Sequence, residues 1–157
     1  MVHSNVCGPM THLSLGGASY FVSFIEDSTL WAYLIRTKDR VFSIFSYWLA
    51  MVENQSGRKL KCLRTDNKGE FKSKEFVKFC RERYSSEHNG IAEHMNQTIQ
   101  ECVVSMLQHS GLSDGLWAEA LLTAVHIINM SPSRPLGLQI PQQLWMGSKP
   151  NYDKLTI

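Results

Sequence analysis

The sequence predicts an α/β fold in which a mixed sheet is flanked by helices. Two runs rich in aromatic and β-branched side chains, residues 18–25 and 30–35, are separated by only four residues. This arrangement is typical of an antiparallel hairpin. Residues 41–52 then carry apolar side chains at intervals of three and four, which indicates a helix packed on a sheet. Because a further short apolar run and more helical segments follow, the order of elements is that of an α/β protein.

The first half of the chain is expected to supply all the strands. A short apolar-leaning run at residues 2–6 is stopped by Gly8-Pro9. The hairpin follows, and its turn is predicted at residues 26–29, which read Glu-Asp-Ser-Thr. The helix after the hairpin is expected to end at Gly57, because glycine readily takes the left-handed conformation that closes a helix. A last short strand is predicted at residues 60–63.

The second half is predicted to be helical. Ser73 is a suitable N-cap for a short helix, and a long amphipathic helix is expected from about residue 91 to residue 108. The apolar face of that long helix is predicted to consist of Ile91, Met95, Ile99, Cys102, Val103 and Met106. Residues 112–130 are expected to form another helix with Ser113 as its N-cap. One short final turn of helix is predicted at residues 141–145.

Composition bounds the function only loosely. The chain has 157 residues, of which 43% are hydrophobic and 19% are charged, as in an ordinary soluble globular protein. Its net charge of +2 gives no strong signal for nucleic acid. No apolar run is long enough to span a bilayer and no targeting segment is seen, so we expect no membrane partner and an intracellular location, in the nucleus or the cytoplasm. The four cysteines are too widely spaced for a zinc site, and we expect reduced thiols.

Two segments carry the candidate chemistry. Residues 63–71 read LRTDNKGEF and place Asp66 at the end of a strand-like run, and residues 88–96 read HNGIAEHMN and place Glu93 on the first turn of the long helix. Metal-dependent nucleic-acid enzymes bring two carboxylates together in this way, because carboxylate oxygens are the ligands that Mg²⁺ prefers. Either residue alone would be interpreted as an ordinary solvated carboxylate. The pair is what favours a metal site.

These two strings, in this order, resemble the integrase catalytic core of copia-type long-terminal-repeat retrotransposons, and the resemblance covers nearly the whole chain. It implies a ribonuclease-H-like three-layer fold and DNA integration by polynucleotidyl transfer, with three acidic residues holding two Mg²⁺ (or Mn²⁺) ions. It also implies DNA partners, namely the retrotransposon ends and the target, and assembly as a homo-oligomer. Residues 1–110 would then be the catalytic core and residues 111–157 its helical extension, in a fragment of a longer Pol polyprotein.

The resemblance assigns the family's second aspartate to Asp66 and its glutamate to Glu93, but the first aspartate falls on Asn5. Asparagine is nearly isosteric with aspartate but neutral, and it offers one carbonyl oxygen where a carboxylate offers two. A site that holds two divalent cations would lose a full negative charge at a shared ligand. We therefore expect weakened or lost Mg²⁺ binding, with Asp66 and Glu93 as the remaining metal ligands, and a catalytically defective enzyme.

Chain length between the two motifs gives a second departure. Only 26 residues lie between Asp66 and Glu93, fewer than the family pattern has, and the missing piece is expected between Arg83 and Tyr84. The family carries an extra strand there, so the last edge strand of the sheet is predicted to be absent. A smaller deletion is expected in the hairpin, between Thr29 and Trp31. The shorter link predicts either that the preceding helix unravels or that Glu93 sits away from Asp66.

Nucleic-acid contacts are implied by the resemblance at five positions: Lys68, Lys72, Asn89, His94 and Gln97. The family usually has arginines on the helix that bears Glu93, and their replacement here removes counterion-releasing contacts with phosphate. The lysines around Lys72 form a modest basic cluster, for which a solvated helix face is the simpler interpretation.

Two other interpretations stay open. The chain could be a non-catalytic module that keeps the fold for weak nucleic-acid or protein association, for instance through the helix at residues 112–130. It could also be a translated pseudogene fragment without a selected role. DNA binding without turnover would favour the first of these.

Overall fold

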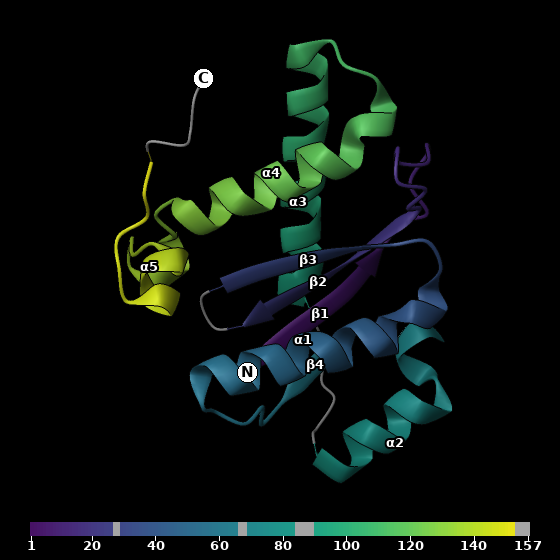
Figure 1. The fold of residues 1–157 in the computed structure, drawn as a ribbon, viewed down its shortest axis with the longest axis vertical. Helices are drawn as coiled ribbons and strands as arrows, with labels where there is room; N and C mark the ends of the chain where they lie inside the picture. Colours follow the sequence, from purple (N-terminus) through teal and green to yellow (C-terminus); the bar gives the residue numbers. More distant parts are fainter. Residues whose placement is uncertain (27–28, 66–68, 84–89, 153–157) are drawn as a thin grey trace.

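The structure is a computed structural model that describes residues 1–26, 29–65, 69–83 and 90–152. Four strands form one mixed sheet with helices on both sides (Figure 1). The strands are β1 (Val2–Cys7), β2 (Tyr20–Glu26), β3 (Thr29–Ile35) and β4 (Leu63–Thr65). Their order in the sheet is β3-β2-β1-β4, with β4 parallel to β1 and the other pairs antiparallel. The predicted α/β class and the hairpin are confirmed, and the described residues form no strand beyond β4.

Five α-helices and four short 3₁₀ turns complete the described part. The helices are α1 (Val41–Ser56), α2 (Lys74–Arg83), α3 (Gly90–Ser110), α4 (Trp117–Met130) and α5 (Pro141–Met146). The 3₁₀ turns are η1 (Lys38–Arg40), η2 (Gly69–Lys72), η3 (Asp114–Leu116) and η4 (Arg134–Leu136). Among the described residues, no helix is long and apolar enough to cross a membrane.

One face of the sheet packs against α1. Successive strand residues point to opposite faces, so alternate apolar residues of β1 and β2, such as Val6 and Phe24, meet the apolar stripe of the helix. The Phe24 ring stacks on Trp48 with centroids 4.6 Å apart, and both side chains are fully buried. Gly57 takes a left-handed conformation (φ 64°) and ends α1, as predicted. α2 packs beside α1, where the Phe45 and Phe76 rings lie 5.1 Å apart.

The opposite face packs against α3 and α4 (Figure 1). Phe21 and Leu30 from the hairpin meet Ile99 of α3 and Leu121 of α4 in one buried cluster. These helices therefore complete a three-layer arrangement of helix, sheet and helix. Alternate residues of β1 face α1 on one side of the sheet and α3 on the other.

The N-cap predictions are confirmed in part. The Phe76 backbone N–H donates to Ser73 Oγ at 3.2 Å, so Ser73 caps α2 as predicted. The second predicted N-cap, Ser113, accepts from the Gly115 N–H at 3.3 Å. It caps the 3₁₀ turn η3 rather than an α-helix. The α-helical segment expected from residue 112 therefore begins only at Trp117.

The last strand also lies later than predicted. Of the expected strand residues 60–63, only Leu63 belongs to β4. The Leu60 N–H donates to the Glu53 carboxylate at 3.0 Å, so this stretch is tied to the end of α1 rather than to the sheet. The Cys62 carbonyl accepts from the Val2 N–H at 3.0 Å, which joins the end of this stretch to β1.

The predicted apolar face of α3 is confirmed at Ile99 and Val103, which are buried, and at Met95, which packs partly buried against the same cluster, but it is wrong at Ile91. Its buried residues are Ala92, Asn96, Ile99 and Val103, whereas Ile91 is 53% exposed. Ranking positions by hydrophobicity favoured Ile91 over its neighbour Ala92 and passed over Asn96. Asn96 is buried because the sheet presents a polar partner, Ser23, to this helix.

The edge of the sheet at β3 is covered by one side chain of α4. The Asn129 amide donates from Nδ2 to the Leu30 carbonyl at 2.7 Å, and its Oδ1 accepts from the Leu30 N–H at 2.9 Å. Both backbone groups of this edge residue are thus bonded to the helix.

Candidate functional site

Asn5 lies within β1 and is 6% exposed. It stands directly opposite Ser23 of β2, and cross-strand partners project their side chains from the same face. Ser23 contacts α3, so the Asn5 side chain also faces α3. Asn5 Oδ1 is buried and has no hydrogen-bond partner among the described residues. Since an unpaired buried acceptor is costly, this amide oxygen is an unsatisfied group at the position that the sequence singled out.

Ser23 joins the sheet to α3. Its hydroxyl lies 2.7 Å from Asn96 Oδ1 and 3.4 Å from the Asn5 carbonyl oxygen. A hydroxyl carries one proton, and the shorter contact identifies Asn96 as the acceptor. Asn96 is 4% exposed, and its Nδ2 has no partner in the part of the chain that the structure describes. A buried neutral polar cluster of Asn5, Ser23 and Asn96 therefore occupies the interface between β1, β2 and α3.

Glu93 is exposed and lies on the first turn of α3, three residues before Asn96. Residues three apart are neighbours on a helix surface, so the Ser23–Asn96 contact holds the turn that carries Glu93 against the sheet. Asp66 lies outside the described residues. It follows Thr65, the last residue of β4, and Thr65 pairs with Ser4, the residue before Asn5. The fold thus brings Asn5, the end of β4 and the start of α3 to one region of the sheet.

The predicted nucleic-acid contacts fall in different places. Lys68 and Asn89 lie outside the described residues. Lys72 belongs to η2, and its side chain also lies outside the description. His94 and Gln97 are exposed on α3, and Gln97 donates to the Glu101 carboxylate at 3.0 Å. Both are free of the core and face solvent, as a residue that contacts nucleic acid must.

The described side chains do not fit a pair of Mg²⁺ ions. Among described residues, no three acidic, histidine or cysteine side chains gather closely enough to hold a metal. In this region Glu93 offers an exposed carboxylate, whereas Asn5, Ser23 and Asn96 offer neutral oxygens. Magnesium is usually held through carboxylates and water.

Sequence reasoning missed Ser23 and Asn96. Ser23 lies within an otherwise apolar strand, and Asn96 follows Glu93 at a spacing that puts both on neighbouring turns of α3. A polar residue at a predicted buried position in each of two packed elements is the signal that could have identified them.

Comparisons with known proteins agree with this geometry. No family model matches the chain. The retrovirus-related Pol polyprotein from transposon TNT 1-94 of Nicotiana tabacum is 45% identical over 168 residues, which cover all of this chain and 13% of that protein. Those from transposons RE2 and RE1 of Arabidopsis thaliana are 31% and 29% identical, over 92% of this chain and 11% and 10% of their own lengths. The chain thus spans only a small part of these relatives.

A solved structure matches the fold. The catalytic core domain of HTLV-2 integrase, in complex with magnesium and in a trimeric form, superposes with a TM-score of 0.59. The match covers 91% of this chain and 95% of that one at 16% sequence identity, a likeness that concerns the fold alone.

Proposed function

Because the chain is homologous to one segment of the retrovirus-related Pol polyproteins of transposons and has the ribonuclease-H-like fold of a retroviral integrase catalytic core, we propose that it is a retrotransposon integrase core fragment that has lost its catalytic function. The ancestral reaction is DNA integration by polynucleotidyl transfer, and the copia type is the member of this class that the chain resembles. DNA ends and target DNA are the proposed partners of the ancestral site.

The identity of residue 5 is the observation that carries the proposal. An integrase core needs a carboxylate there, and this chain has a buried neutral amide whose oxygen is unpaired among the described residues. Two magnesium ions bring four positive charges, and each lost carboxylate leaves one of them without compensation. Asp66 and Glu93 are the proposed remaining ligands, and they would hold at most a weakly bound ion.

Missing chain length supports the same conclusion. The alignment with the tobacco relative extends over 168 residues, whereas this chain has 157, a difference of 11 (168 − 157). This excess agrees with the deletions expected before Tyr84 and in the hairpin. The sheet of the described residues ends at β4, where the family is expected to have one further strand. A shortened link between Asp66 and Glu93 restricts how both could approach one ion.

Calorimetric titration of the full chain with Mg²⁺ and with Mn²⁺ tests this proposal. We expect no binding of two ions, and at most one weak site that disappears in an Asp66→Asn variant. A Glu101→Gln variant is a matched control, because Glu101 lies on α3 away from the site and its loss should leave metal binding unchanged. Two tightly bound ions per chain would overturn the proposed loss of function.

A non-catalytic nucleic-acid-binding remnant of the same fold is the second candidate. The observation that favours it is a group of exposed cations around a cavity on the α1 side of the sheet, at Arg58, Lys59 and Lys61. Salt-dependent DNA binding without nicking or strand transfer would favour this candidate over a residual enzyme.

A further inference from the structure

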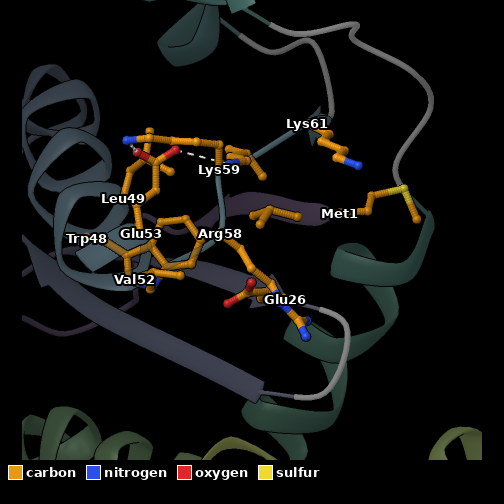
Figure 2. Close-up of a pocket in the computed structure, with 11 residues that line it drawn as sticks. Met1, Glu26, Trp48, Leu49, Val52, Glu53, Arg58, Lys59 and Lys61 are labelled. Atoms are coloured by element: carbon orange, nitrogen blue, oxygen red, sulfur yellow. Dashed lines mark hydrogen bonds and ion pairs between the residues drawn. The ribbon is translucent and has the colours of Figure 1, made fainter. Parts of the chain in front are cut away.

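A cavity of about 510 Å³ opens beside the start of β1, on the side of the sheet that α1 covers (Figure 2). Its inner wall is apolar and buried, made by Val2 of β1 with Trp48 and Val52 of α1. These residues belong to the core on the α1 face, whereas Asn5 faces α3. The cavity is therefore separate from the candidate metal site.

The rim of this cavity is basic. Arg58, Lys59 and Lys61 all line it and are all exposed, and they come from one segment of four residues between α1 and β4. Two carboxylates, Glu26 and Glu53, also line the cavity. Three cations against two acids leave one positive charge in excess.

The Glu53 carboxylate is held by internal hydrogen bonds. The Glu53 side chain is only 11% exposed and accepts from Lys59 Nζ at 2.6 Å and from the Leu60 N–H at 3.0 Å. Within the described ranges, neither Arg58 nor Lys61 forms an ion pair with a carboxylate. In Figure 2 the Arg58 side chain extends toward Glu26, whereas Lys61 points away from both acids. An anion at the rim would thus find Lys61 available and would compete with Glu26 for Arg58.

The backbone of the basic segment is held at several points. Gly57 closes α1 in the left-handed conformation, and the Arg58 N–H donates to Ser56 Oγ at 3.2 Å. Leu60 packs against the core on the α1 face, and beyond it the Cys62 carbonyl accepts from the Val2 N–H. A segment fixed in this way loses little conformational entropy when it binds, which favours affinity.

We propose that this basic segment, residues 58–61, binds phosphate groups of nucleic acid in a metal-independent manner, with Arg58 and Lys61 making the contacts. Arginine and lysine that neutralise phosphates release condensed counterions, so such binding is strongly salt-dependent. The inference rests on the proposed function only in taking nucleic acid as the source of the phosphates. A small free phosphate compound would present the same phosphate oxygens to Arg58 and Lys61, so the experiment must distinguish it from nucleic acid.

Fluorescence anisotropy of a labelled DNA duplex, titrated with the full chain in EDTA at several salt concentrations, tests this. An Arg58→Ala/Lys61→Ala variant should bind more weakly, and the slope of log K against log salt should become shallower by up to about 1.8, because each phosphate contact contributes about 0.9. An Arg134→Ala/Lys149→Ala variant is the matched control. It removes the same two residue types at exposed positions outside the cavity, and it should keep the wild-type slope.

Equal slopes and affinities for the two double variants would overturn the proposal. A second arm measures inorganic pyrophosphate binding by calorimetry. If pyrophosphate binds the wild-type chain and is lost in Arg58→Ala/Lys61→Ala while the DNA slope is unchanged, the nucleic-acid assignment is wrong and the ligand is a small phosphate. Both measurements are made without divalent metal. A negative result in either of them is therefore independent of the metal titration, in which binding of two ions would overturn the proposed function.

Discussion

Ser23 and Asn96 connect the sheet to α3 through a buried hydrogen bond of 2.7 Å between Ser23 Oγ and Asn96 Oδ1. The bond lies one helical turn from Glu93 and directly beside Asn5 in the strand register. A contact between two neutral side chains therefore helps to hold the N-terminal part of α3 against the sheet.

Replacing Asn96 by Ala should destabilise the protein by about 1–3 kcal/mol, because the buried Ser23 hydroxyl loses its acceptor. Chemical denaturation with urea measures this as a lower transition midpoint. Gln97→Ala is the matched control, since Gln97 is the adjacent amide but its bond to Glu101 is exposed, and we expect a change within about 0.5 kcal/mol. Equal losses in the two variants would show that the Ser23 contact contributes nothing specific.

Asn5→Asp alone should not restore strand transfer. The substitution returns the missing carboxylate, but the short link between Asp66 and Glu93 remains. The measurement is Mg²⁺-dependent strand transfer on an oligonucleotide that mimics a retrotransposon end. Any product formed by Asn5→Asp and abolished in Asn5→Asp/Glu93→Gln would contradict this expectation and show that the deletion is tolerated.

Trp48→Ala should cost about 3–5 kcal/mol of unfolding free energy, as large-to-small substitutions of buried aromatic residues do. Its ring is fully buried against Phe24. The neighbouring Tyr47 is 67% exposed on the same helix, so Tyr47→Ala should change stability by about 0.5 kcal/mol or less. Urea denaturation of the two variants compares them directly, and a similar loss for both would mean that α1 is rotated relative to the sheet.

Tyr33 should make stability fall at alkaline pH. Burial of its hydroxyl raises the pKa of Tyr33 above its ordinary value of 10.0, and the charge on Tyr47 raises it further. The folded state therefore holds this proton more tightly than the unfolded state. Its contribution to stability is complete below pH 10.0 and is lost as the pH rises through the folded-state pKa.

Urea midpoints measured from neutral to strongly alkaline pH test this dependence on Tyr33. The Tyr33→Phe variant should show a flatter decline above the ordinary tyrosine pKa, because it removes the titrating group. Tyr47→Phe should lower the pKa of Tyr33 without removing it, which absorbance of the phenolate reports. A Tyr33→Phe variant that declines as steeply as the wild-type chain would refute the assignment.

Much of the fold could be predicted because its elements carry strong periodic signals. The hairpin has two continuous β-branched and aromatic runs with a turn between them, and α1 has an uninterrupted apolar stripe that ends at Gly57. Where the sequence pattern of an element was short, the predicted residue range differed from the one in the structure. The strand β4 has three described residues, and the stretch before it is bonded to Glu53 through the Leu60 N–H, a contact that no local pattern reveals.

The candidate site was harder to predict than the fold. Asn5 could be singled out by comparison with a family pattern, but its unsatisfied oxygen and the Ser23–Asn96 contact depend on how β1, β2 and α3 meet in space. Tertiary packing also decides which face of α3 is buried. The rim at Arg58 and Lys61 gave no sequence signal, because isolated basic residues between a helix and a strand are common on protein surfaces. Asp66 stays a prediction, since it lies outside the described residues.

The Asn129 amide has a consequence for how copies of this chain meet. An incoming strand from another molecule would have to strip Leu30 of both its existing bonds before it could extend the sheet at β3. At the far side, the described part of the edge is β4, which has three residues. Short or blocked borders of this kind discourage intermolecular β-pairing. Fibrillar association through the described edges of the sheet is thus disfavoured at Leu30 and limited in length at β4.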